Sequence, residues 1–293
     1  MHKSGFVNII GNPNVGKSTL MNALVGERLS IITSKAQTTR HRIMGIVNGE
    51  DFQIVYSDTP GILKPSYKLQ ESMMKFVKGA VSDADVILYV TDTVEQSDRS
   101  AEIVERIAAS GIPTIVVVNK IDLTTPDKLE ALVEKWHAIL PNAEIAPASA
   151  KEGFNIGGIF DSILRLLPEG EPFYPKDTLT DKTLRFFASE IIREKILHTY
   201  DKEIPYCCEI AIDSYKEEPT IDRIAATIYV TRDSQKGIII GHRGEMLKKV
   251  GTQARIDLEK FLGKKVFLEL FVKVGGDWRN DERQLRRFGY EQD

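Results

Sequence analysis

The chain has 293 residues, of which 42% are hydrophobic and 28% charged, and its formal net charge is −3. This composition is that of a soluble globular protein, and the length predicts two packed cores. We expect no membrane-spanning segment and no secretory leader, because no apolar run approaches the roughly 20 residues that cross a bilayer. The two cysteines, Cys207 and Cys208, are expected to be reduced thiols on opposite sides of a strand, not a disulfide or a metal site.

A phosphate-binding motif separates the first strand-like run, Phe6 to Ile10, from a helical stretch at 18–25. It has the pattern G-x-x-x-x-G-K-S, in which the glycines let backbone N–H groups turn toward phosphate oxygens. Lys17 supplies a charge for the β/γ oxygens, Ser18 offers a hydroxyl to Mg²⁺, and the helix dipole faces the same anions. The motif therefore predicts a nucleoside-triphosphate site made by Gly11, Asn12, Pro13, Asn14, Val15, Gly16, Lys17, Ser18 and Thr19.

A second motif follows the strand-like run Ile54 to Tyr56. Asp58 can hold a water ligand of Mg²⁺, and the N–H of Gly61 can meet the γ-phosphate. Alone, this segment would be read as a turn, but its position after the phosphate motif is that of a nucleotide switch. We therefore assign to the nucleotide site Asp58, Thr59, Pro60, Gly61 and Ile62.

Two further motifs predict the base. After the apolar run Ile115 to Val118, Asp122 can accept hydrogen bonds from N1–H and the 2-amino group of guanine, a donor pair that adenine lacks. After Ile145 to Ala148, the backbone N–H of Ala150 can contact the guanine oxygen. An ATP-driven remodeller is the alternative if Asp122 does not read the base. The predicted base contacts are Asn119, Lys120, Asp122, Ser149, Ala150 and Lys151.

These ordered motifs resemble those of the translation-factor-related GTPases. The Asn-Pro-Asn-Val sequence at 12–15, Gln-Thr-Thr-Arg at 37–40 and Asp-Thr-Pro-Gly-Ile at 58–62 are similar to the Era-type branch. The resemblance implies hydrolysis of GTP with Mg²⁺, held by Ser18, Asp58 and one of Thr38 and Thr39, of which we prefer Thr39. It also places catalytic roles on Lys17, Thr39 and Gly61. We expect residues 30–42, which we call the switch loop, to lack regular structure.

Position 62 departs from the Ras-like pattern, in which a glutamine orients the attacking water. Ile62 has no group that can do so, and hydrolysis must depend on Lys17, Mg²⁺, backbone donors and a further cation. Similar GTPases with an apolar residue here and an asparagine matching Asn14 often recruit K⁺. The resemblance thus suggests K⁺ at Asn14, and the alternative is an asparagine satisfied by its own turn.

The second half contains a Gly-His-Arg-Gly tetrad at 241–244, followed by a helical pattern from Glu245 to Leu262. The tetrad resembles the G-x-x-G loop of a KH domain, which binds about four nucleotides of single-stranded RNA. A helix at 184–200, strands at 206–213 and 224–231 and a last strand at 266–274 complete the order of a bacterial-type KH fold. Predicted RNA contacts are Lys236, Ile239, Gly241, His242, Arg243, Gly244 and Lys248, with Ile238 to Ile240 as an apolar platform for bases.

Residues 236–265 contain eight basic and three acidic side chains, which favours an RNA partner. We expect a doubly wound α/β GTPase domain at 1–172, a linker at 173–181 and an α+β KH domain with a C-terminal helix at 182–293. Three prolines and a glycine between Leu167 and Pro175 mark the boundary, because they interrupt both periodicities. The resemblance implies binding of the 3′ end of small-subunit ribosomal RNA and assembly of the small ribosomal subunit in the bacterial cytoplasm, and it is compatible with peripheral association with the inner membrane. The alternative is a signalling GTPase whose second domain binds a protein.

Overall fold

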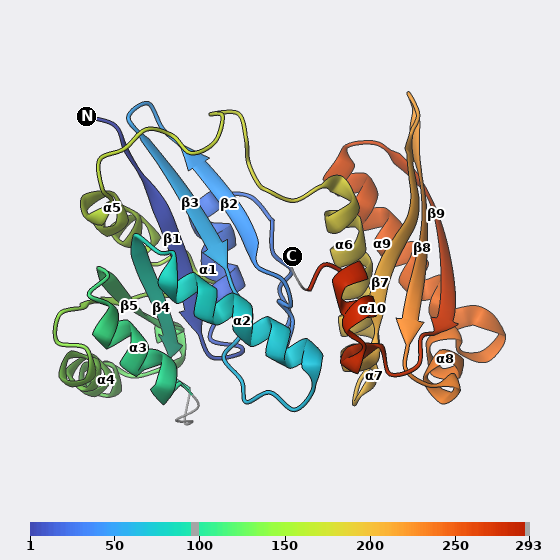
Figure 1. Cartoon of the computed structure of the whole chain (residues 1–293), viewed down its shortest axis with the longest axis horizontal. Helices are drawn as coiled ribbons and strands as arrows, with labels where there is room; N and C mark the ends of the chain where they lie inside the picture. The colour runs from blue at the N-terminus through green and yellow to red at the C-terminus, as the bar shows by residue number, and fades with distance from the viewer. Residues whose placement is uncertain (95–99, 291–293) are drawn as a thin grey trace. The chain divides into compact units, whose positions relative to one another are not determined.

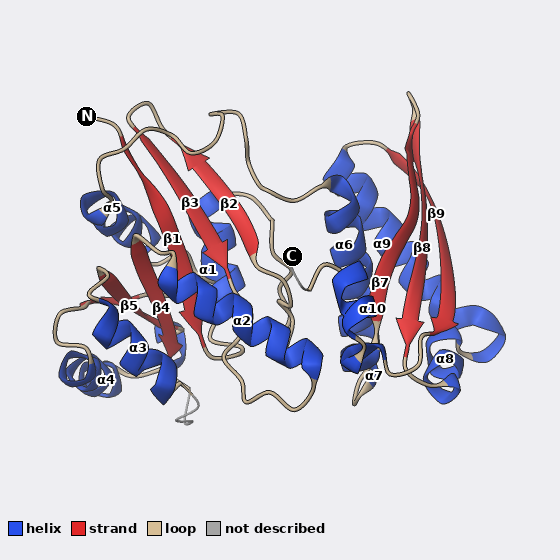
Figure 2. Ribbon diagram, in the orientation of Figure 1, coloured by secondary structure: helices blue, strands red, loops and turns tan. Residues whose placement is uncertain are grey.

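The chain divides into two compact units, each with its own sheet (Figures 1 and 2). The main division falls between Asp181 and Lys182, and the short segment Tyr67–Leu69 is grouped with the second unit. The computed structural model describes residues 1–94 and 100–290. Within these ranges no helix is long and apolar enough to cross a membrane.

The first unit is built on a six-stranded sheet with the order β2-β3-β1-β4-β5-β6. Strand β2 is antiparallel to β3, and the other neighbouring strands are parallel. Helices α1 and α5 cover one face and α2, α3 and α4 the other, which is the predicted doubly wound arrangement (Figure 2). The elements are β1 (Lys3–Gly11), α1 (Lys17–Val25), β2 (Ile43–Asn48), β3 (Phe52–Asp58), α2 (Lys68–Ser82), β4 (Val86–Asp92), α3 (Ala101–Ser110), β5 (Thr114–Asn119), α4 (Pro126–Ile139), β6 (Glu144–Pro147) and α5 (Ile156–Leu166).

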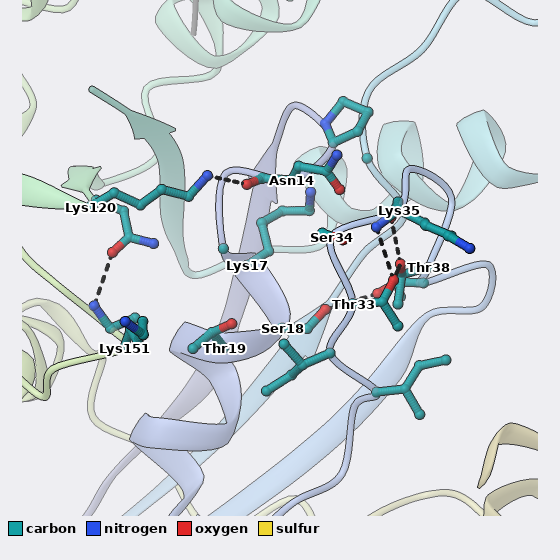
Figure 3. A pocket seen from close by; sticks show the side chains of 18 of the residues that line it. Asn14, Lys17, Ser18, Thr19, Thr33, Ser34, Lys35, Thr38, Lys120 and Lys151 are labelled. Atoms are coloured by element: carbon teal, nitrogen blue, oxygen red, sulfur yellow. Dashed lines mark hydrogen bonds between the residues drawn. The ribbon is translucent and has the colours of Figure 1, made fainter. Parts of the chain in front are cut away.

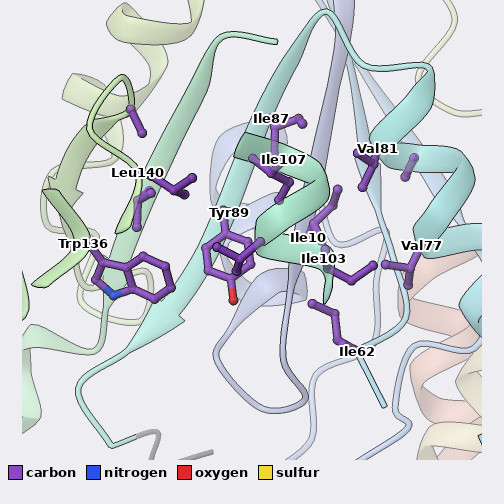
Figure 4. Packing of buried hydrophobic residues seen from close by; sticks show 14 of the residues in the cluster. Ile10, Ile62, Val77, Val81, Ile87, Tyr89, Ile103, Ile107, Trp136 and Leu140 are labelled. Carbon is purple, nitrogen blue, oxygen red and sulfur yellow. The ribbon is translucent and has the colours of Figure 1, made fainter. Parts of the chain in front are cut away.

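The parallel strands are continuous apolar runs because helices cover both of their faces. All seven residues of β4 are buried, and Tyr89 in this strand packs its ring 5.1 Å from that of Trp136 on α4 (Figure 4). Because β3, β1, β4, β5 and β6 are parallel, the carboxyl ends of β1, β3, β5 and β6 lie at one edge of the sheet. The strand order reverses at β1, and ligands of such sheets bind beside this point. The loops that follow these strands are the four predicted motifs.

The segment at 173–181 differs from the linker that the sequence suggested. Its backbone is held along the first unit: Ile46 N–H on β2 donates to the carbonyl of Leu179 at 2.8 Å. Gln53 on β3 is fully buried, and its Oε1 accepts the N–H groups of Phe173 and Tyr174. The segment forms no strand, but its polar groups pair with the otherwise open edge of β2. By these contacts the segment belongs to the first unit.

The second unit has a three-stranded sheet, with β7 antiparallel to β8 and β8 parallel to β9. Helices α6 and α9 pack on one face of this sheet, and the core contains Ile192, Ile228 and Val250. The elements are α6 (Leu184–Thr199), α7 (Ile204–Cys207), β7 (Glu209–Glu217), β8 (Ile221–Val230), α8 (Asp233–Ile240), α9 (Glu245–Leu262), β9 (Lys265–Val274) and α10 (Glu282–Arg287). Apart from the short helix α7, this order of helices and strands is the one predicted from the sequence.

The cysteines do not lie in a strand. Pro205 lies in the first turn of the short helix α7, which occupies the beginning of the predicted strand at 206–213. The thiols of Cys207 and Cys208 both donate to the carbonyl of Ile204, at 3.3 and 2.9 Å, so they do not point in opposite directions as predicted. Both cysteines are buried.

Candidate nucleotide site and nucleic-acid interface

The phosphate loop, residues 11–18, connects β1 to α1 and begins the first site. Gly16 has φ of 96°, and a Cβ there would lie 2.3 Å from Nδ2 of Asn119, so this position requires glycine. Lys17 is buried, and its ammonium donates to the carbonyls of Gly11 and Asn12 at 3.0 and 2.8 Å. The cation is therefore held within the loop that the motif assigns to phosphate binding.

Three oxygen-bearing side chains from different elements meet beside this loop. Ser18 Oγ on α1 donates to Asp58 Oδ2 at 2.7 Å and lies 2.9 Å from Thr39 Oγ1 of the switch loop. Thr39 Oγ1 also donates to Asp58 Oδ2, at 3.2 Å. Thr38 instead donates to the carbonyl of Lys35 and contacts Thr33, within the switch loop itself. The geometry therefore favours Thr39 over Thr38 as a partner of Ser18 and Asp58.

The Asp58 carboxylate is fully buried, and in the described part of the chain its Oδ1 has no hydrogen-bond partner. Burial raises the pKa of Asp58, and the positive charge of Lys17 and the hydroxyl of Ser18 oppose this shift. Carboxylate and hydroxyl oxygens are the hard ligands that Mg²⁺ prefers. The residues thus fit a magnesium ion, because such an ion supplies the positive charge that a buried carboxylate needs.

The segment after β3 packs directly against the phosphate loop. A Cβ on Gly61 would lie 2.8 Å from Cα of Pro13, so only glycine permits this approach. Thr59 Oγ1 donates to the carbonyl of Ile9, and the N–H of Ile62 donates to the carbonyl of Gly11. These bonds hold the segment beside the site.

Ile62 itself does not face the nucleotide pocket, although the sequence analysis assigned it to the site. Its side chain is 2% exposed and lies in the hydrophobic core with Ile10 and Val77 (Figure 4). An apolar side chain beside the α2 face of the sheet gains more from this packing than from a polar pocket. Ile62 is therefore a core residue, and its side chain does not line the nucleotide pocket. The conclusion that it cannot orient a water molecule is unchanged.

The predicted base-reading loops are connected to each other and to the phosphate loop. The buried Asn119 side chain donates from Nδ2 to the carbonyl of Val15 at 2.8 Å and accepts the N–H of Ala150 at 2.9 Å. In this arrangement the Ala150 amide, predicted to face the guanine oxygen, is paired with Asn119. Ser149 Oγ donates to Oδ1 of the exposed Asp122 at 2.6 Å and so orients its carboxylate.

A pocket of about 790 Å³ is lined by residues of the phosphate loop, the segment after β3 and the two base-reading loops (Figure 3). This volume lies in the range of small-molecule sites. The switch loop forms one wall, a contribution that the sequence analysis missed outside Thr38 and Thr39. The position of this loop between α1 and β2, beside the phosphate loop, is the sequence feature that could have predicted its place in the pocket. The residues from this loop are Ile31, Ile32, Thr33, Ser34, Lys35, Gln37, Thr38 and Thr39, and the predicted residues that line the pocket are Pro13, Asn14, Gly16, Lys17, Ser18, Thr19, Gly61, Asn119, Lys120, Asp122, Ser149, Ala150 and Lys151.

The second unit presents the Gly-His-Arg-Gly tetrad between α8 and α9. Gly241, Arg243 and Gly244 have φ of 73°, 50° and 81°, which turns the chain sharply between the two helices. His242 and Arg243 are exposed at this turn. Lys248 on the first turns of α9 and Lys236 on α8 lie on either side of it in the sequence. The predicted polar contacts therefore gather around one loop.

A groove of about 370 Å³ continues from this loop between α9 and β9. Leu268 and Leu270 of β9 form its apolar side, and Lys248 and Arg255 of α9 place cations beside it. This combination suits a single-stranded nucleic acid, which offers apolar bases and an anionic backbone. The sequence does not reveal the β9 residues of this groove, because the face of β9 to which they belong is set by the packing of α9.

Ile239 was predicted to be part of a platform for bases, and the structure contradicts this. Ile239 is fully buried and packs in the core with Val250 and Val272, while Ile238 is 48% exposed. Adjacent residues of a helix point in directions about 100° apart, so Ile238 to Ile240 cannot form one surface. Ile239 is therefore a core residue.

Comparisons with known proteins assign a family model to each unit. A family model described as 50S ribosome-binding GTPase matches residues 6–120, and a KH domain model matches residues 203–279. A crystal structure of Era in complex with MgGDPNP and nucleotides 1506–1542 of 16S ribosomal RNA is 42% identical to this chain and covers 100% of both chains, with a TM-score of 0.96. The chain belongs to the Era family. A single-residue variant of Aquifex aeolicus Era bound to GDP·AlF4⁻ is also 42% identical over 99% of this chain and 100% of its own, with a TM-score of 0.95.

Membership in the Era family confirms the predicted fold class, a P-loop GTPase domain followed by a KH domain. It also decides between GTP and ATP, since the matching family model is that of a GTPase. The pocket and the α9/β9 groove lie in the two units to which these family models correspond.

Proposed function

We propose that this chain is a Mg²⁺-dependent GTPase switch that binds the 3′ end of small-subunit ribosomal RNA and acts in assembly of the small ribosomal subunit. The observation that carries the proposal is the presence, in one chain, of the Ser18, Thr39 and Asp58 cluster and the basic α9/β9 groove. A similar protein, Era, binds MgGDPNP together with nucleotides of 16S ribosomal RNA, which supports the same pairing of ligands here.

In the nucleotide pocket, Lys17 and the phosphate-loop amides would bind the phosphates, and Asp122 would read guanine. Ser18, Thr39 and Asp58 would hold Mg²⁺, which neutralises negative charge on the phosphate oxygens. Thr39 belongs to the switch loop, so its contact with Mg²⁺ and the γ-phosphate would distinguish a triphosphate form from a diphosphate form. Hydrolysis would proceed without a glutamine that orients water, because position 62 is an isoleucine and its side chain lies in the core.

We also propose that Asn14 provides a ligand for K⁺. Asn14 is exposed and lines the pocket, and its φ of 65° is a left-handed conformation that asparagine tolerates better than most residues. Its backbone carbonyl is bonded to Lys120, whereas its side-chain amide faces the pocket (Figure 3). A monovalent cation there would supply positive charge near the transferred phosphate, a role that an arginine finger has in other GTPases.

In the second unit, Arg243 and Lys248 would bind the RNA backbone and the apolar side of the groove would contact the bases. A protein that acts in small-subunit assembly would work in the bacterial cytoplasm, which is part of the proposal. Fractionation of cells tests the further expectation of peripheral association with the inner membrane: a salt-extractable membrane fraction supports it, and exclusive recovery with ribosomal particles contradicts it.

The direct test is crosslinking in cells followed by sequencing of the bound RNA, together with GTP hydrolysis by the purified chain. We expect reads concentrated at the 3′ end of small-subunit ribosomal RNA and phosphate release that requires Mg²⁺. Lys17→Ala should abolish tight binding of GTP and keep the fold, since the ammonium bonds carbonyls of its own loop. Reads spread over unrelated RNAs, or capture of a protein without RNA, would favour the signalling alternative.

A further inference from the structure

We infer that Asp92 is a positioning residue of the nucleotide site, which fixes Lys120 against the phosphate loop and thereby orients the loop's amides toward the phosphates. Asp92 lies outside all four sequence motifs, at the end of β4. The inference rests on the proposed function and deepens it, because it adds a residue that controls the retention of nucleotide.

Both oxygens of the Asp92 carboxylate are engaged. Asp92 is 5% exposed, and its Oδ2 lies 2.6 Å from the ammonium of Lys120. Its Oδ1 accepts the N–H of Val94 at 3.0 Å. In the register of β4 and β5, Asp92 is the direct neighbour of Asn119, which precedes Lys120. A buried, doubly bonded carboxylate beside the base-reading loop is therefore rigidly placed.

Lys120 is held at its backbone and at its ammonium. Its φ of 61° is unusual for a lysine, and the hydroxyl of Thr93 donates to its carbonyl at 3.0 Å. From this position the ammonium donates to the backbone carbonyl of Asn14 at 2.5 Å (Figure 3). A lysine ammonium on a four-carbon stem is flexible, so a fixed counter-charge decides where it stays. Asp92 supplies that charge from the end of the neighbouring strand.

The bond to Asn14 matters because a trans peptide places its C=O and N–H on opposite sides. When Lys120 draws the carbonyl of Asn14 to one side, the N–H of Val15 in the same peptide points to the other. Backbone N–H groups of phosphate loops bind phosphate by pointing into the loop's concave side. Asn14 is also in a left-handed conformation, which persists only where its surroundings hold it. The pair of Asp92 and Lys120 supplies a contact that holds Asn14 in this conformation.

The experiment measures the dissociation rate of a fluorescent GDP from the intact chain. We expect Asp92→Asn to release GDP about tenfold to a hundredfold faster, the range of a lost hydrogen bond to a charged group. Lys120→Met should give a similar rate, and the double variant should be no faster than Lys120→Met alone, because Asp92 acts through Lys120. The preference for GTP over xanthosine triphosphate should stay unchanged in Asp92→Asn.

Asp85→Asn is the matched control, since Asp85 immediately precedes the other end of the same strand and bonds the N–H of Phe6. It should release GDP at the rate of the unaltered chain. If Asp92→Asn does not fold, Asp92→Ser keeps an acceptor for Val94 without the charge. An unchanged rate in both Asp92 variants, or effects that add fully to that of Lys120→Met, would overturn the inference. Failure of the unaltered chain to bind GDP would instead refute the proposed function.

Discussion

The backbone N–H of Met44 donates to the carboxylate of Asp181 at 3.1 Å, and the hydroxyl of Thr180 donates to the carbonyl of Met44 at 2.6 Å. Met44 is the second residue of β2, which begins where the switch loop ends. Asp181 is the last residue of the first unit. The strand that follows the switch loop is therefore bonded to the residues that lead into the KH domain.

This contact predicts a role in coupling. We expect the double variant Thr180→Val, Asp181→Ala to reduce, several-fold, the ratio of RNA affinities between the GTP-analogue and GDP forms, which is on the order of 5- to 150-fold for typical coupled sites. GTP affinity without RNA should be unchanged, because neither residue lines the pocket. Lys176→Ala is the control: it belongs to the same segment but bonds the carbonyls of Gly49 and Glu50. Full coupling in the double variant would contradict this role.

Base selection is expected to depend on Asp122. Asp122→Asn replaces an acceptor by a donor, so the variant should lose roughly a hundredfold in GTP affinity and gain affinity for xanthosine triphosphate, whose 2-oxo group accepts a hydrogen bond. Titration with both nucleotides measures this change in base preference. Ser149→Ala removes only the hydroxyl that orients Asp122, and we expect a smaller loss with no gain for the xanthine nucleotide. Undiminished GTP affinity in Asp122→Asn would refute the assignment.

Hydrolysis without a glutamine is expected to be slow and to respond to K⁺. Replacing Na⁺ by K⁺ at constant ionic strength should raise the rate of phosphate release, and Asn14→Ala should remove most of that rise. The variant should still bind GTP, since the contact of Lys120 with position 14 is made through the backbone carbonyl. Equal rates in the two salts would refute the role of K⁺ and would not contradict GTP hydrolysis itself.

The sequence predicted the elements whose residues carry a strong local pattern. The apolar runs predicted to end at Ile10, Tyr56 and Val118 lie in buried strands, and α9 has the predicted bounds Glu245–Leu262. Ile239 was misassigned because three consecutive isoleucines do not reveal which one faces the core; α9 and β9 decide this by packing against it. Asp92 is visible as a carboxylate after an apolar run, but its partner Lys120 is revealed only by the pairing of β4 with β5.

The α9/β9 groove is expected to bind RNA through exposed cations. Arg243→Ala with Lys248→Ala should weaken RNA broadly across sequences and should reduce the slope of log affinity against log salt by about one unit or more. Lys260→Ala is the matched control, an exposed lysine on the last turn of α9 that does not line the groove. Nucleotide affinity of the RNA-free protein should be the same in all variants. An equal effect of Lys260→Ala would mean that the charge excess acts without a defined groove.

We expect the nucleotide state of the first unit to control RNA binding by the second. The most direct test of this expectation is the dissociation constant of an RNA with the sequence of the small-subunit 3′ end, measured at several salt concentrations for the chain bound to a GTP analogue and to GDP. We predict tighter binding in the triphosphate form at every salt concentration, and RNA should raise the affinity for the GTP analogue by the same factor through linkage. Equal constants for the two forms would contradict the account, leaving a GTPase and an RNA-binding domain that share a chain without coupling.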